Sequence, residues 1–337
     1  MQSTVKPLAS LVGTLLLSLS ATTQAATHWI MATGYPQESF FTKNIEQFIE
    51  EIETKSDGEL TIDLRANGTL IKHDAIKRAV QTGQVQIGEI RPSVYGNEDP
   101  MYVLDSLPGV ATTYDQAYQL MEAQAPFFDK LFAKQSIIPL AYVAWPGQGF
   151  FTAEPLDSVE DMRGKKIRIY SQPTREMAEQ LGFQATILPF AEIAQAYSTG
   201  MIDSLFTSAQ TGIDVQIWDY TKHFTYTGTM HTKNAIIVNQ RAFSSLSDDL
   251  QAIVREAGER ATERGWRMSQ EAADANDETL IEHGMQVSQA GDDIQAAIAR
   301  IGDDMLEEWR NNAPEEERAV LDRYLKVRDG ARTSASL

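Results

Sequence analysis

Cysteine is missing from this chain of 337 residues. A chain without Cys cannot carry the lipid-modified N-terminal cysteine that anchors many exported bacterial proteins, and it has no disulfides. Small secreted domains usually depend on disulfides for stability. If the chain is exported, a size of this order without any Cys is therefore typical of a bacterial periplasm.

Basic residues are scarce as well. The 29 Lys and Arg residues face 47 Asp and Glu residues, which gives a formal net charge of −18. Nucleic-acid binding requires basic patches, so this balance argues against a nucleic-acid partner. A large net charge of one sign favours solubility.

Motifs for catalysis and metal binding are also lacking. The five His residues have no pair at metal-ligand spacing, and no acidic cluster matches a calcium loop. No G-x-S-x-G, glycine-rich phosphate loop or HExxH occurs in the sequence. A catalytic triad assembled from distant positions stays open. We nevertheless expect no enzyme activity, no cofactor and no bound metal.

The N-terminus carries a short apolar stretch, Leu8 to Leu19, preceded by Lys6. A stretch of this length suits a signal sequence and is too short to span a bilayer. Thr23-Gln24-Ala25 offers the small residues of a cleavage site. We expect residues 1–25 to be a signal peptide, cut after Ala25 or one residue later, and the protein to be periplasmic. The alternative is a retained membrane anchor.

The rest of the chain is long enough for about two domains. Expected strands and helices alternate in two sets that are divided near residues 145–152. This alternation predicts two α/β lobes with mostly parallel sheets. The expected strands cover 60–64, 84–90, 137–145, 166–170, 185–188, 204–207, 224–228 and 235–238, and the expected helices cover 39–57, 74–81, 174–181 and 190–197.

A much longer helix is expected from Asp248 to about His283, because this stretch has no Pro and almost no turn signal. It exceeds the length that one small lobe needs, so it can lie across both. We expect one lobe to comprise residues 26–145 and 234–270, and the other 146–233 and 271–312. Residues 313–337 are expected to form a C-terminal helix and a tail that is frayed from Gly330 onward.

A set of short motifs in a fixed order resembles the DctP-type solute receptors of tripartite ATP-independent periplasmic (TRAP) transporters. Each motif is short, but the ordered set is specific and covers nearly the whole chain after the signal. The motifs are Val80-Gln81-Thr82-Gly83, Ile87-Gly88, Leu107-Pro108, residues 156–162, Gly164-Lys165-Lys166-Ile167-Arg168, Gly182, Leu188-Pro189-Phe190, Glu192 and Gly200-Met201-Ile202-Asp203.

The resemblance implies a two-lobed periplasmic-binding-protein fold with a lobe-spanning helix. It also implies a small-molecule ligand and a membrane permease of a small and a large subunit as partner. From the short signal and the lack of Cys, we expect the mature protein to be a soluble monomer. A sensor that uses the same fold without transport is an alternative.

The resemblance also assigns site residues. The arginine of the G-x-K-[IV]-R strand binds the ligand's carboxylate in this family, and here it is Arg168. A planar guanidinium can hold both carboxylate oxygens in a fork. Phe190 aligns with an aromatic residue that packs on the ligand, and Ser171 with a polar contact. Thr207 stands where many members have an Asn that assists the carboxylate.

Two departures bear on the ligand. Gln148 lies where several members with acidic ligands have a second Arg, and Glu89 lies at the carboxyl edge of its strand, where ligand crevices occur. A pocket with one Arg and one Glu would suit an amine or zwitterion, which is the alternative to a simple organic acid. Another interpretation is that Glu89 is solvated or paired with Arg91. Trp145 and Trp218 either wall the pocket or fill core.

Overall fold

The computed structural model of this protein describes residues 26–335. The expected signal peptide, with Lys6 and the cleavage site after Ala25, lies outside the described residues. Within them, the chain forms two α/β lobes, each built on its own sheet. The two-lobed α/β fold expected from the sequence is confirmed.

The first lobe is built on a five-stranded sheet of order β2-β1-β3-β10-β4. Helix α1 packs on β2, α2 on β3, and α3 on β4. The strands are β1 (Thr27–Ala32), β2 (Leu60–Arg65), β3 (Ile87–Ile90), β4 (Ile137–Ala144) and β10 (Lys233–Asn239), and the helices are α1 (Phe40–Lys55), α2 (Ile76–Thr82), α3 (Tyr114–Ala133) and α7 (Gln240–Ser244).

The second lobe is built on a six-stranded sheet of order β11-β9-β5-β8-β6-β7. Its strands are β5 (Gln148–Thr152), β6 (Lys166–Ile169), β7 (Gln184–Ile187), β8 (Ser204–Ser208), β9 (His223–Tyr226) and β11 (Gln286–Gln289). Its helices are α4 (Gln172–Gln180), α5 (Ile193–Ser198) and α6 (Ala209–Asp214).

The sheets are mixed rather than mostly parallel, which corrects the expectation. Strand β10 is antiparallel to β3 and β4, and β5 is antiparallel to β8 and β9. Among the described residues the chain passes between the sheets three times: between β4 and β5, between β9 and β10, and between β10 and β11. The first two passages deliver strands that run against their new neighbours, whereas β11 is parallel to β9.

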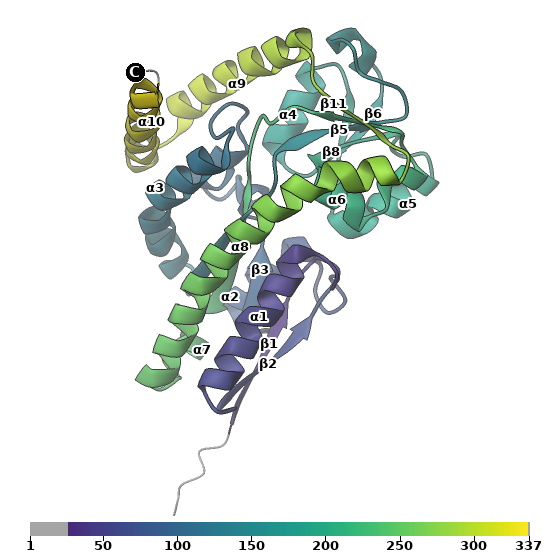
Figure 1. Cartoon of the computed structure of the whole chain (residues 1–337). Coiled ribbons are helices and arrows are strands. Elements are labelled where there is room, and N and C mark those ends of the chain that lie inside the picture. The colour runs from purple at the N-terminus through teal and green to yellow at the C-terminus, as the bar shows by residue number, and fades with distance from the viewer. Residues whose placement is uncertain (1–25, 336–337) are drawn as a thin grey trace, which may run out of the picture.

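Helix α8 (Asp248–Glu282) runs from the first lobe to the second (Figure 1). It packs on α1 and β4 in the first lobe and on α6 and β11 in the second. The Ser247 hydroxyl accepts a hydrogen bond from the Leu250 amide and so caps its first turn. The long lobe-spanning helix is thus present where the sequence predicts it.

The chain ends in two further helices, α9 (Asp292–Asn312) and α10 (Glu315–Ala335). Helix α9 leads back from the second lobe, and α10 lies beside α3 of the first lobe (Figure 1). Helix α10 continues to Ala335, so the tail expected to fray from Gly330 is helical. No helix among residues 26–335 combines the length and apolar character needed to cross a membrane.

Candidate ligand cavity between the lobes

A small cavity lies where the two lobes meet. Its empty space is about 310 Å³, and the centre of a water molecule can reach only about 20 Å³ of it, so its walls close tightly. The walls come from both lobes and from the segments that join β4 to β5 and β9 to β10. The lining residues are Tyr35, Arg91, Trp145, Gln148, Arg168, Tyr170, Phe190, Thr207, Thr211 and Thr232.

Arg168 on β6 is the cationic centre of this cavity. It is 2% exposed, and its Nε donates a hydrogen bond to the Leu188 carbonyl at 2.9 Å. No described acidic side chain lies within ion-pair distance of its guanidinium, and no described acceptor takes a bond from its terminal nitrogens. Burial, and then the charge of Arg91, lower the pKa of Arg168 to about 9. The side chain is still charged at neutral pH.

Arg91 supplies a second guanidinium from the first lobe, directly after β3. Its Nη2 donates to the Tyr170 carbonyl at 3.2 Å and lies 3.6 Å from the Asp74 carboxylate, whose side chain is half exposed. Its buried Nε has no hydrogen-bond partner among the described residues. The expectation of a single Arg is therefore wrong. Arg91 directly follows β3, at the carboxyl edge of the sheet where ligand crevices occur. This position could have identified Arg91 as a site residue from the sequence.

Glu89 does not line the cavity, contrary to the expectation. It is 1% exposed, and both carboxylate oxygens are engaged, by the Thr33 hydroxyl at 2.5 Å and by the Asn234 amide. Burial raises the pKa of Glu89 to about 7, and these two hydrogen bonds limit the rise. Its carboxylate is therefore held by protein partners and is not among the groups that line the cavity.

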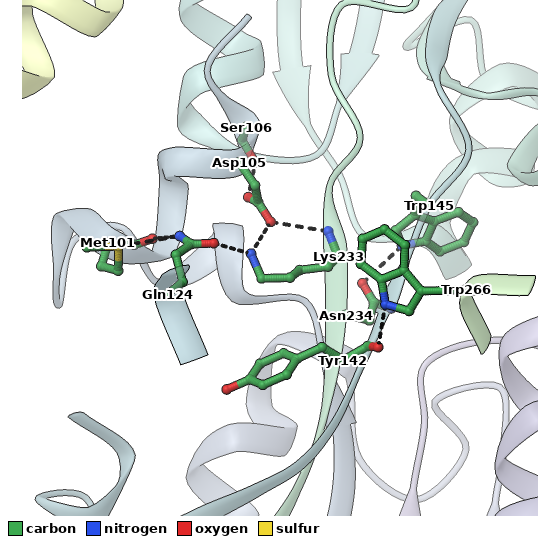
Figure 2. A network of polar contacts seen from close by, with 9 residues as sticks. All are labelled: Met101, Asp105, Ser106, Gln124, Tyr142, Trp145, Lys233, Asn234 and Trp266. Carbon is green, nitrogen blue, oxygen red and sulfur yellow. Dashed lines mark hydrogen bonds and ion pairs between the residues drawn. The ribbon is translucent and has the colours of Figure 1, made fainter. Parts of the chain in front are cut away.

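Glu89 instead supports the cavity wall through its partner. Asn234 donates to Glu89 and accepts a hydrogen bond from the indole Nε1 of Trp145 at 2.9 Å. Figure 2 shows the Trp145–Asn234 bond beside a buried ion pair at the start of β10. There, Lys233 Nζ lies 2.9 Å from the Asp105 carboxylate and 2.6 Å from the Gln124 amide oxygen. Lys233 and Asn234 are neighbours on β10, so their side chains point to opposite faces of the sheet. The ion pair of Lys233 fixes the start of the strand and thereby also holds Asn234 in place.

Aromatic side chains form one wall of the cavity. The Tyr35 ring lies 5.1 Å from the Trp145 ring and 5.5 Å from the Phe190 ring, in tilted and edge-to-face arrangements. Trp145 and Phe190 therefore line the cavity as well as contributing to core. Tyr35 was not identified from the sequence, because it follows β1 in the other lobe.

Polar groups complete the walls. Gln148 donates to the Pro146 carbonyl at 2.9 Å and accepts from the Tyr170 hydroxyl at 3.3 Å. Thr207 on β8 lies in the cavity with Thr211 and Thr232. No residue that lines the cavity, within the described part of the chain, is acidic.

Ser171 and Trp218 do not line the cavity. Ser171 precedes α4, and its hydroxyl bonds with that of Thr174 to close the first turn of the helix. The Trp218 ring stacks on the His283 ring, with 3.8 Å between the two ring centroids. The described residues also hold no group of three or more His, Cys, Asp or Glu side chains that could bind a metal ion.

Residues 31–312 match the sequence model of the DctP family, described as bacterial extracellular solute-binding protein, family 7. This match spans most of the chain, including both sheets and the cavity.

This chain belongs to the DctP family.

Solved DctP-family structures resemble the chain throughout. A Bordetella pertussis extracytoplasmic solute receptor that binds pyroglutamic acid is 40% identical, with a TM-score of 0.87 over 89% of this chain and 100% of the other. A solute-binding protein from a marine metagenome, specific for pyroglutamate, is 30% identical, with a TM-score of 0.87 over 89% and 99%. The ectoine-binding periplasmic protein TeaA of Halomonas elongata is 26% identical over 92% of this chain and 89% of its own.

Membership of the DctP family confirms the resemblance seen in the sequence. The family consists of extracytoplasmic receptors that bind small molecules and work with a membrane permease. It is a family of binding proteins rather than of enzymes.

Proposed function

We propose that this protein is a periplasmic TRAP receptor for a compact cyclic carboxylate, pyroglutamate, with the carboxylate held by Arg168. After export and removal of residues 1–25, it delivers the ligand to a membrane permease pair and catalyses no reaction. We expect it to act as a monomer.

The observation that carries the proposal is the buried and unpaired charge of Arg168. Buried charges in proteins are normally paired, because taking a charge out of water is costly. Arg168 has no acidic partner in the described chain, and Arg91 adds a second positive charge nearby. A carboxylate bound between the lobes would accept hydrogen bonds in a fork from the terminal nitrogens of Arg168 and relieve the repulsion.

The size and chemistry of the cavity favour pyroglutamate within this class. The centre of a water molecule reaches only about 20 Å³ of the cavity, so its tight walls suit a small ligand only. The aromatic wall of Tyr35, Trp145 and Phe190 suits a flat five-membered ring. The Thr207 hydroxyl offers a partner for the lactam N–H or C=O group. Two relatives at 30% and 40% identity bind this acid.

The cavity favours an acid over an amine or a zwitterion. The amine interpretation required Glu89 as the counter-ion, but both oxygens of Glu89 bond to Thr33 and Asn234 behind the wall. A ligand ammonium would lie near Arg91 and Arg168 with no carboxylate among the lining residues.

Calorimetric titration of the purified protein with three ring compounds tests this proposal. We expect tight binding of pyroglutamate. Pyroglutamide lacks the negative charge and should bind roughly thirtyfold more weakly or worse, because a buried charged hydrogen bond contributes on the order of 2–5 kcal/mol. Proline keeps the carboxylate but carries an ammonium, and it should also bind weakly.

Equal affinity for pyroglutamide and pyroglutamate would contradict the role of the carboxylate. A preference for proline would favour the zwitterion interpretation. If pyroglutamate fails but another compact carboxylic acid raises the melting temperature in a thermal-shift screen, the ligand class stands and the named ligand does not.

A further inference from the structure

A large groove lies next to the ligand cavity. The centre of a water molecule can reach about 1110 Å³ of its space, against about 20 Å³ in the cavity. It lies between the segment 93–107 of the first lobe, the start of α4, and α9. The groove has ample room for part of a ligand, and the cavity has none to spare.

One residue is common to the walls of the two spaces. Among the described residues, Tyr170 alone borders both the cavity and the groove. It comes two residues after Arg168, just past the end of β6, and its ring lies beside the Arg168 guanidinium. Tyr170 therefore lies at the anchor for the proposed carboxylate.

The Tyr170 ring is held firmly in this position. Its centroid lies 5.5 Å from the Arg91 Cζ and 5.7 Å from the Arg168 Cζ. Its hydroxyl donates to the Gln148 amide oxygen at 3.3 Å. Its carbonyl accepts a bond from Arg91 at 3.2 Å. These contacts place the ring beside both guanidinium groups and tie its hydroxyl to the cavity wall.

The groove behind this wall differs from the cavity in charge. Its sides carry apolar groups from both lobes and from α9, among them Val94, Val103, Ile187 and Trp309. Four acidic residues also line it, Asp74, Glu98, Glu176 and Glu308, and none of its described lining residues is Lys or Arg. It would accept an apolar tail and reject a second carboxylate.

We infer that Tyr170 determines the maximum length of the ligand, because it closes the carboxylate site off from an apolar groove that would otherwise extend it. The inference rests on the proposed carboxylate site. The substrate class of the native protein is then limited to compact acids. Removal of the ring alone should admit monocarboxylates with an apolar tail.

The experiment measures dissociation constants for straight-chain monocarboxylates from propionate to octanoate, with pyroglutamate as the compact reference. In the wild-type protein and in Tyr170→Phe, affinity should stop rising after the shortest acids. In Tyr170→Ala it should rise about threefold to fourfold with each added methylene that reaches the groove. Octanoate should thus gain at least roughly tenfold over the wild-type protein.

Two controls locate the effect. Suberate has the length of octanoate with a carboxylate at each end, and it should gain nothing in Tyr170→Ala. Ile187 lines the groove and is 41% exposed, so Ile187→Trp can fill the groove from its edge. The double variant Tyr170→Ala/Ile187→Trp should lose the gain for octanoate, while Ile187→Trp alone should keep the affinity for pyroglutamate.

Several outcomes would overturn the inference. They are no gain for octanoate in Tyr170→Ala, an equal gain for suberate, or a gain that persists in the double variant. If Tyr170→Ala does not fold, Tyr170→Val is tested by the same criteria. Failure of the wild-type protein to bind pyroglutamate would count against the named ligand alone, because the length series depends only on an acid held by Arg168. Failure of every carboxylate in every variant would overturn both.

Discussion

At the scale of single residues, burial shifts two neighbouring pKa values in opposite directions. Glu89 and His73 face each other behind the cavity, with Oε2 and Nε2 4.0 Å apart. Burial raises the pKa of Glu89 from 4.5 to about 7. Burial, and then Arg91, lower the pKa of His73 from 6.5 to about 3. Both side chains thus favour their neutral forms in the folded protein.

These shifts make stability depend on pH. Between about pH 4.5 and 7, folded Glu89 keeps a proton that the unfolded chain has released, so its contribution to stability falls as pH rises. Between about pH 3 and 6.5, the unfolded chain holds a proton on His73 that the folded protein lacks, so this contribution rises with pH. The two trends oppose each other where they overlap.

The substitution Glu89→Gln separates the pH dependence of stability due to Glu89 from that due to His73. It removes the Glu89 trend and leaves that of His73, so the stability of the variant relative to the wild-type protein should increase from about pH 4.5 to 7, by on the order of 3 kcal/mol. Urea unfolding of both proteins at a series of pH values measures this difference. A difference that stays constant across this window would show that Glu89 titrates normally.

At the scale of secondary-structure elements, the long helix α8 approaches β4 closely enough to require glycine. A Cβ added at Gly258 would lie 2.3 Å from the backbone oxygen of Leu140. No real Cβ contact is that short, so the helix or the strand would have to move. Gly258 thus sets the distance between α8 and the sheet of the first lobe.

Gly258→Ala should destabilise the protein by about 1–3 kcal/mol, although Ala is the better helix former, because the collision with backbone outweighs the gain in propensity. Gly330→Ala in α10 is the matched control, since an added Cβ meets nothing within 4 Å there. It should be neutral or stabilise the protein by up to about 1 kcal/mol. Chemical denaturation of both variants measures the effect, and equal stabilities would refute the close-packing argument.

The sequence predicts some elements well and others poorly, for physical reasons. Helix α8 begins at the predicted Asp248 and ends one residue before the predicted His283, because its apolar spacing is long and uninterrupted. Helix α3 was not predicted, and it contains Pro126, which interrupts the pattern. Strand β5 has only five residues and follows Pro146-Gly147, which resembles a turn. Its antiparallel pairing depends on the passage between lobes, which local sequence does not encode.

At the scale of the whole molecule, the cavity exists only because two lobes meet. The second lobe contributes Arg168 and Phe190, which lie in the ordered motifs, and Gln148 and Thr207, which stand where the sequence departs from the family. The first lobe contributes Arg91 and Tyr35, which no motif marks as belonging to the same site. Arg91 and Tyr35 come to lie opposite Arg168 only in the tertiary structure. Their place in the site therefore cannot be predicted from local sequence. The limits of the two lobes by residue number stay a prediction.

The central claim is that Arg168 binds the carboxylate of the ligand, and one substitution tests it most directly. Arg168→Lys keeps the positive charge but cannot form the two parallel hydrogen bonds of a guanidinium. Calorimetric titration with pyroglutamate should show affinity reduced roughly thirtyfold or more. Arg175→Lys is the matched control, because Arg175 is half exposed and, among residues 26–335, its ion pair is with Glu179 on its own helix. It should bind like the wild-type protein. Wild-type affinity in Arg168→Lys would contradict the account.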